Sequence, residues 1–211
     1  MDKTINRRKT GILGGTFNPI HIGHLILAQN ALEYCGLDEV LIMPSGVSYL
    51  KDPADIAPTH HRVNMVRLAI KGNDKLYLST LETEREGNSY TFETLDILTK
   101  ENPDVDYHYI TGADTLFSME SWKRPDLIFD KCTVVCAKRG GYDHKKLSEK
   151  AAHLKELFGA RIIIMDVPEL EISSSFIRDA LSHNKSCRYY LDDRVTDYIK
   201  VNGLYGFDRD K

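Results

Sequence analysis

Two histidines three residues apart, His21 and His24, follow a glycine-rich turn near the start of the chain. Residues at this spacing lie on one face of a helix start, where two imidazoles can hold an anion together. Gly14 and Gly15 lack a Cβ, so a phosphate can approach the backbone amides of the turn closely. Glycine-rich turns and single histidines are each common in structural roles, but their combination from Gly14 to His24 predicts a phosphate site.

A second cluster of this kind lies late in the chain, where three serines precede an arginine. The residues are Ser173, Ser174, Ser175 and Arg178. Hydroxyls and amides at a helix start bind anions, and a guanidinium presents a planar fork to phosphate oxygens. Serine is also an ordinary N-cap and an exposed arginine is usually solvated, so the residue types alone leave both interpretations open.

Short apolar runs of β type alternate with longer helical patterns along the chain, which is typical of a parallel sheet flanked by helices. We expect strands over residues 11–14, 39–44, 76–81, 106–111, 132–138 and 160–166. We expect helices over residues 24–35, 59–71, 91–101, 115–130, 144–158, 174–183 and 192–202. The pattern predicts a doubly wound α/β fold, with an N-terminal extension over 1–9 and a single domain over 10–211. Ligands of such a sheet bind beyond the carboxyl ends of its strands, where the glycine turn begins.

The composition and the charge disfavour several classes of partner and site. Lys and Arg number 28 against 31 Asp and Glu, a net charge of −3, so we expect no nucleic-acid partner. The sequence has no signal-peptide pattern and no membrane-spanning run, so we expect no membrane association. The four cysteines lack the paired spacings of a zinc site and are expected to be free thiols in a reducing cytoplasm.

The first cluster resembles the signature of the nucleotidyltransferase superfamily, a Gly-Gly-Thr-Phe-Asn-Pro turn followed by His-x-Gly-His. The second, from Ser173 to Arg178, resembles the superfamily's later Ser-Ser-Ser-x-Ile-Arg signature. From Thr10 to about Tyr205 the chain resembles bacterial nicotinate mononucleotide adenylyltransferases. These enzymes join ATP to nicotinate mononucleotide, giving deamido-NAD and pyrophosphate in NAD biosynthesis.

The resemblance implies two sets of binding residues. The ATP set is Gly14, Gly15, Thr16, Phe17, His21, His24, Gly112, Asp114, Arg139, Ser173, Ser174, Ser175, Ile177 and Arg178. The mononucleotide set is Asn18, Lys51, Tyr90, Thr91 and Trp122, with Trp122 placed to stack on the pyridine ring. Plain structural roles stay open for several of these residues. Thr91 and Asp114 could be helix caps, Trp122 a loop-edge aromatic, and Arg139 and Lys51 solvated surface residues.

One segment departs from the family pattern. After Pro44 the family usually reads Pro-x-x-x-Pro-Pro-His-Lys, whereas this chain has Ser45 to Lys51 without the later prolines and the histidine. The irregular stretch from Ser45 to Pro58 is long enough to form a substrate loop or lid. Lys51 can still meet the mononucleotide phosphate as a point charge, on a loop less rigid than in relatives.

The expected chemistry needs no catalytic base, because the acceptor phosphate, with a second pKa of about 6, is already largely ionised. We therefore assign His21, His24 and Arg178 to aligning phosphates and stabilising their charge. Mg²⁺ is expected on the triphosphate, held chiefly by phosphate oxygens and water, without a dedicated protein metal site.

Other interpretations stay open at this stage. Class I aminoacyl-tRNA synthetases share the His-Ile-Gly-His sequence, but the short chain and its negative charge disfavour them. Another phosphorylated acceptor, such as nicotinamide mononucleotide, and a catalytically silent nucleotide-binding module also remain. A homo-oligomer is neither indicated nor excluded.

Overall fold

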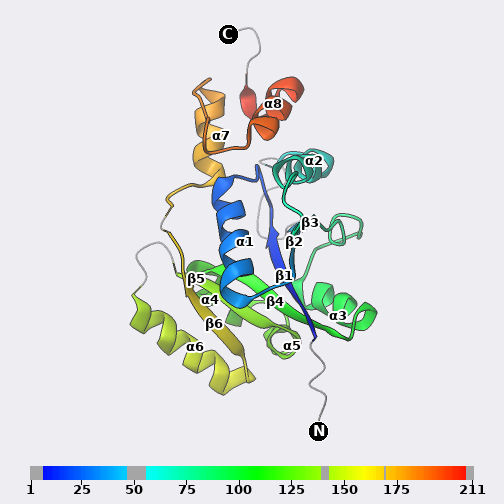
Figure 1. Ribbon diagram of the computed structural model, residues 1–211, viewed down its shortest axis with the longest axis vertical. Helices are drawn as coiled ribbons and strands as arrows, with labels where there is room; N and C mark the ends of the chain where they lie inside the picture. Colours follow the sequence, from blue (N-terminus) through cyan, green and yellow to red (C-terminus); the bar gives the residue numbers. More distant parts are fainter. Residues whose placement is uncertain (1–6, 47–55, 139–142, 169, 208–211) are drawn as a thin grey trace. The chain divides into compact units, whose positions relative to one another are not determined.

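The structure, a computed structural model, describes residues 7–46, 56–138, 143–168 and 170–207 (Figure 1). Its strands form a six-stranded sheet in the order β3-β2-β1-β4-β5-β6. They are β1 (Arg8–Gly15), β2 (Glu39–Pro44), β3 (Leu76–Leu78), β4 (Val105–Gly112), β5 (Thr133–Lys138) and β6 (Arg161–Asp166). The pairings β1 with β4, β4 with β5 and β5 with β6 are parallel. This strand order is that of a doubly wound α/β sheet, so the predicted fold class is confirmed.

The helices follow the strands in alternation (Figure 1). They are α1 (Ile22–Cys35), α2 (Thr59–Ala69), α3 (Thr91–Glu101), α4 (Ala113–Ser118), α5 (Pro125–Lys131), α6 (His144–Phe158), α7 (Ser174–Ser182) and α8 (Asp193–Asn202), with short 3-10 turns η2 (Met119–Ser121) and η3 (Leu204–Gly206).

One expected helix is wrong. Instead of a single helix over residues 115–130, the chain forms α4, η2 and α5 with a break before Pro125. Arg124 has a left-handed backbone with φ 54°, and Pro125 opens α5. Proline has no amide hydrogen and disfavours helical geometry in the residue before it, so the helix must stop and restart here.

Strand β1 begins earlier than expected, inside the predicted N-terminal extension. The Arg8 guanidinium and the Thr10 hydroxyl both donate to the Glu39 carboxylate on β2. The Lys9 amide donates to Asp38 Oδ2 at 2.8 Å. Polar residues that pair with Glu39 and Asp38 therefore extend β1 toward the N-terminus. The pattern of apolar residues in the sequence could not indicate this extension. Strand β3 is shorter than expected and ends at Leu78.

Contacts divide the chain into two compact units. The first comprises residues 1–13, 30–41 and 90–169, and the second comprises 14–29, 42–89 and 170–211. In the first unit β5 is buried along most of its length, and Gly11 of β1 is closely covered. A Cβ at Gly11 would lie 2.8 Å from Val40 and 2.9 Å from Ile110 and Leu37, which explains a glycine in this strand.

Candidate active site

The glycine turn lies in the second unit, at the carboxyl end of β1. Its backbone is tied to the end of β2, because the Ser45 amide donates to the Gly15 carbonyl at 2.8 Å. Phe17 turns the chain with a positive φ of 48° and is only 2% exposed. Gly14, Gly15 and Thr16 are half-buried. The half-buried backbone of the glycine turn therefore lies next to the buried side chain of Phe17.

His21 and His24 stand together at the start of α1. Their rings are stacked, with centroids 3.7 Å apart, and Phe17 meets the His24 ring edge-on at 5.0 Å. His24 Nδ1 accepts the His21 amide at 3.2 Å. Because Nδ1 is an acceptor, a neutral His24 carries its hydrogen on Nε2, which makes that atom a donor for a phosphate oxygen. A Cβ at Gly23 would lie 3.1 Å from His21 Nδ1, so glycine suits the position between the histidines.

The serine-arginine cluster opens α7 and contacts the glycine turn directly. Ser173 caps the helix by accepting the Phe176 amide at 3.1 Å. The Ser174 hydroxyl donates to the Pro19 carbonyl at 2.9 Å, and Arg178 Nη1 donates to the Asn18 carbonyl at 2.9 Å. Two clusters more than 150 residues apart in the sequence thus meet through hydrogen bonds within one unit.

Arg178 and Ser175 also line a hollow of about 610 Å³ bordered by Pro58 and Tyr205. Arg178 Nη2 lies 3.5 Å from the Ser175 hydroxyl, so the guanidinium faces the exposed serine end of the helix. Ile177 has a different place. Its side chain is fully buried and its amide donates to the Ser173 carbonyl, which gives it a packing role, and its implied contact with ATP stays a prediction.

Arg62 of α2 is a residue that the sequence did not point out. It is 2% exposed and donates to the carbonyls of Thr16, Ser45 and Ala57 at 2.8–3.1 Å, and to the Thr59 hydroxyl. Burial lowers the pKa of the guanidinium, which nevertheless stays protonated as arginines do in proteins. Arg62 therefore holds the glycine turn to the end of β2 and places a buried positive charge beside both.

Asn18 is the other centre of this network. It is 5% exposed, and its Oδ1 accepts both the Ala57 amide at 3.0 Å and the Tyr205 hydroxyl at 2.9 Å. Burial raises the pKa of Tyr205, so its hydroxyl remains a donor. Tyr205 has a left-handed backbone, φ 59° and ψ 30°, which costs a bulky residue roughly 1–3 kcal/mol. No local sequence pattern indicates these contacts, since they join positions far apart in the chain.

The segment after β2, where the sequence departs from the family pattern, is described only at its two ends. Lys51 lies outside the described residues. The Gly46 amide donates to the Ser89 hydroxyl at 3.1 Å, and a Cβ at Gly46 would lie 2.3 Å from the Glu82 carbonyl oxygen. Glycine at this position lets the start of the segment lie against the loop before α3.

The aromatic residues predicted to meet the mononucleotide lie in the first unit. Tyr90 directly precedes α3, and Thr91 is its first residue. Lys123 Nζ lies 4.1 Å from the centroid of the Tyr90 ring, a cation–π contact that links Tyr90 to the segment of Trp122. The half-buried Trp122 ring meets Tyr109 edge-on at 6.2 Å. The sequence did not indicate Lys123, whose contact depends on the break before α5.

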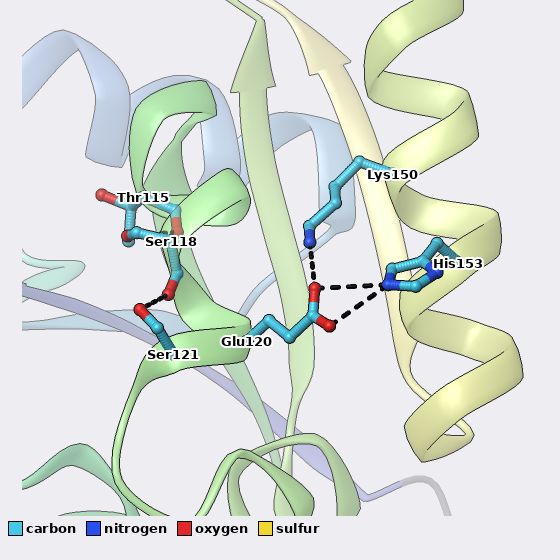
Figure 2. A network of polar contacts seen from close by, with 6 residues as sticks. All are labelled: Thr115, Ser118, Glu120, Ser121, Lys150 and His153. Carbon is cyan, nitrogen blue, oxygen red and sulfur yellow. Dashed lines mark hydrogen bonds and ion pairs between the residues drawn. The ribbon is translucent and has the colours of Figure 1, made fainter.

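A polar network anchors the short turn that carries Trp122 (Figure 2). The Glu120 carboxylate of η2 accepts from Lys150 Nζ at 2.5 Å and lies 3.3 Å from His153 Nε2, both on α6. Lys150 and His153 hold the pKa of Glu120 below its usual range. Hydroxyl-to-carbonyl bonds from Ser118 to Thr115 and from Ser121 to Ser118 tighten the same segment. Trp122 therefore follows a turn held to α6 by charge.

Gly112 and Asp114 stand where β4 passes into α4, also in the first unit. Gly112 is buried at the end of the strand, and Asp114 is exposed in the first turn of the helix. This places a carboxylate beyond a strand end, where ligands of doubly wound sheets bind. Arg139, expected at the end of β5, lies outside the described residues.

Over the described ranges, no group of three or more His, Cys, Asp or Glu side chains is arranged to hold a metal ion. The chain's own side chains thus do not supply a carboxylate cage there. Cys35, Cys132, Cys136 and Cys187 are free thiols, as expected. None of the helices that the structure describes is long and apolar enough to cross a membrane.

The fold corresponds to that of nucleotidyltransferases. Residues 12–180 match the family model described as cytidylyltransferase-like, which covers most of the chain. The solved structure of Plasmodium falciparum nicotinic acid mononucleotide adenylyltransferase complexed with NaAD aligns with a TM-score of 0.80 at 21% identity, covering 96% of this chain and 99% of that one. The chain therefore has the fold of the nucleotidyltransferase class.

Curated relatives define the family more narrowly. A protein of Lachnoclostridium phytofermentans, named "probable nicotinate-nucleotide adenylyltransferase", is 40% identical over 198 residues, which are 94% of this chain and 99% of that protein. A protein of Streptococcus pneumoniae with the same name is 40% identical over 203 residues, 96% of this chain and 91% of its own length. The chain belongs to the nicotinate-nucleotide adenylyltransferase family.

Proposed function

We propose that this protein transfers the adenylyl group of ATP to nicotinate mononucleotide, giving deamido-NAD and pyrophosphate. The observation that carries the proposal is that the serine-arginine helix start is hydrogen-bonded to Asn18 and Pro19, in the turn that leads into the stacked histidine pair. Family membership points to the same reaction. We assign the activity to a domain over residues 10–211.

The chemistry requires alignment and charge stabilisation. An ionised oxygen of the acceptor phosphate attacks the α-phosphorus of ATP, the bond to the bridging oxygen breaks, and pyrophosphate leaves with its electron pair. No proton has to be removed from the acceptor near neutral pH. His24 Nε2–H donates to a phosphate oxygen as charge develops, and His21 lies stacked beside it. Arg178 and the serines at the start of α7 bind the β- and γ-phosphates.

Mg²⁺ accompanies ATP in this proposal. The described side chains do not form a cluster of metal ligands, so the ion would be held by phosphate oxygens and water. It supplies charge neutralisation on the triphosphate, while the histidines, the arginine and the backbone of the turn supply the orientation.

The pyridine ring of the acceptor is assigned to residues of the first unit. Trp122 would stack on the pyridine ring, while Tyr90 and Thr91 at the start of α3 would meet its carboxylate through hydroxyl and amide groups. Lys51 would bind the mononucleotide phosphate, and Asp114 with Arg139 would meet the adenosine of ATP. We place the reaction in the cytoplasm, where the four free thiols stay reduced.

The test is direct. Purified protein is incubated with ATP, Mg²⁺ and either nicotinate or nicotinamide mononucleotide, and pyrophosphate release and the dinucleotide product are measured. The proposal predicts deamido-NAD formation with a higher kcat/KM for the nicotinate substrate. A preference for the amide would reassign the acceptor, and absence of pyrophosphate with both would contradict the proposed reaction.

A further inference from the structure

We infer that Tyr205 is a positioning residue for the phosphate region, acting through Asn18. This inference rests on the proposed adenylyl transfer for its readout. Tyr205 belongs to η3, which lies beyond residue 180, where the match to the cytidylyltransferase-like family model ends. Its hydroxyl nevertheless contacts the turn that precedes the two histidines.

Asn18 is the point at which the tyrosine acts. Its carbonyl oxygen accepts Arg178 Nη1 at 2.9 Å, and its side-chain Oδ1 accepts the Tyr205 hydroxyl at 2.9 Å. The Ala57 amide binds the same Oδ1 at 3.0 Å, so two donors fix the orientation of one buried carboxamide. Through this residue, Tyr205 sets both the path of the turn before His21 and the carbonyl that holds Arg178.

The backbone of Tyr205 supports a role beyond packing. Its left-handed φ of 59° is unfavourable for a bulky side chain, and it lies between Gly203 and Gly206, which also have positive φ. Strained backbone of this kind persists where the surrounding contacts determine it, and such residues concentrate at functional sites. The contacts here are the hydroxyl bond to Asn18, a longer approach to Met65 Sδ at 3.9 Å, and the hollow shared with Arg178.

The test compares two tyrosines that differ in what their hydroxyls contact. Tyr198 of α8 lies in the same unit, and its hydroxyl binds His61 and Asn64 at 2.8 and 3.1 Å, away from the signature turn. Tyr205→Phe and Tyr198→Phe each remove one hydrogen-bonded hydroxyl and keep the ring. We expect Tyr205→Phe to lower kcat roughly fivefold to tenfold with KM for ATP within about twofold, and Tyr198→Phe to leave kcat unchanged. A residue with only a structural role would lower Tm without changing the kcat of the folded protein.

A double-mutant cycle shows whether the effect passes through Asn18. In an Asn18→Ala background, Tyr205→Phe is expected to cause no further loss of kcat. Assays are run at a temperature where circular dichroism shows each variant folded. If Tyr205→Phe does not fold, p-aminophenylalanine at position 205, which keeps a donor at the end of the ring, is expected to retain kcat within about threefold of wild type.

Three results would overturn the inference. They are a folded Tyr205→Phe protein with wild-type kcat, a full additional loss in the Asn18→Ala background, and a folded p-aminophenylalanine protein with kcat lowered tenfold or more. Failure of the proposed function is distinguishable, because the wild-type protein would then release no pyrophosphate.

Discussion

The residues assigned to phosphate binding in the second unit and those assigned to the pyridine ring in the first are held in different ways. His21 and the network residues Asn18 and Arg62 that support its turn are at most 5% exposed, and hydrogen bonds join the glycine turn to α2, α7 and η3. Tyr90 and Trp122 are half-buried, and their rings make cation–π and aromatic contacts. A preorganised polar network suits charge stabilisation, which requires fixed dipoles. Aromatic surfaces suit recognition of a flat ring, for which stacking geometry is more tolerant.

The largest expected effect of a substitution follows from this contrast and concerns His24. His24→Ala removes the Nε2 donor, so kcat should fall about 10²- to 10³-fold, as when one donor of a preorganised site is lost. The free energy of unfolding should change by no more than about 1 kcal/mol. His144→Ala, at the exposed start of α6, serves as the control and should keep wild-type turnover. A His24→Ala enzyme within threefold of wild type would remove His24 from the mechanism.

The next effect concerns stability. Arg62→Met leaves the carbonyls of Thr16, Ser45 and Ala57 without their buried donor, so the protein should lose about 2–4 kcal/mol of unfolding free energy. Arg67→Met, an exposed change on the same helix, should cost less than about 0.5 kcal/mol. Urea denaturation of both variants measures the difference. Equal losses would show that the turn does not depend on Arg62.

A smaller effect is expected for the acceptor residues. Trp122→Ala removes a stacking surface, which should raise KM for nicotinate mononucleotide roughly three- to tenfold and leave KM for ATP within about twofold. Steady-state kinetics with each substrate varied in turn measure both constants. Equal changes in the two constants would contradict the assignment of Trp122 to the pyridine ring.

The smallest effect concerns the anchor of the Trp122 turn. Lys150 and His153 depress the pKa of Glu120, so this carboxylate stabilises the folded state above its unfolded pKa of about 4.3, and the contribution is lost as pH falls through the lower folded value. Glu120→Gln should therefore lower Tm slightly at pH 7, and its Tm should converge with that of wild type in acid. A constant difference in Tm from pH 7 to pH 3 would contradict this account.

Much of the fold could be predicted from the sequence because its signals are local. The helix expected over residues 91–101 has those bounds in the structure, as does the helix from 144 to 158. The break before α5 also had a local signal in Pro125, which the expected long helix ignored. The start of β1 could not be predicted from apolar residues, because it is charged and pairs with Glu39 and Asp38.

The site could be predicted only in part. The glycine turn, the histidines and the serine-arginine helix start are compact motifs, and their expected phosphate chemistry can be stated from residue types and spacing. The roles of Arg62 and Tyr205 could not be predicted, because both bind groups whose positions depend on distant segments of the chain. The residue types alone, an arginine on a helix and a tyrosine in a late segment, do not indicate which groups they bind.

In the proposed mechanism, Arg178 binds the phosphates of ATP, while Trp122 stacks on the pyridine ring of the acceptor. Calorimetric titration with a non-hydrolysable ATP analogue and Mg²⁺, using wild type, Arg178→Ala and Trp122→Ala, tests this division most directly. We expect Arg178→Ala to raise the Kd about tenfold or more, because charge-assisted hydrogen bonds to the triphosphate are lost, and Trp122→Ala to keep the Kd within about twofold of wild type. The reverse order of effects would contradict this division.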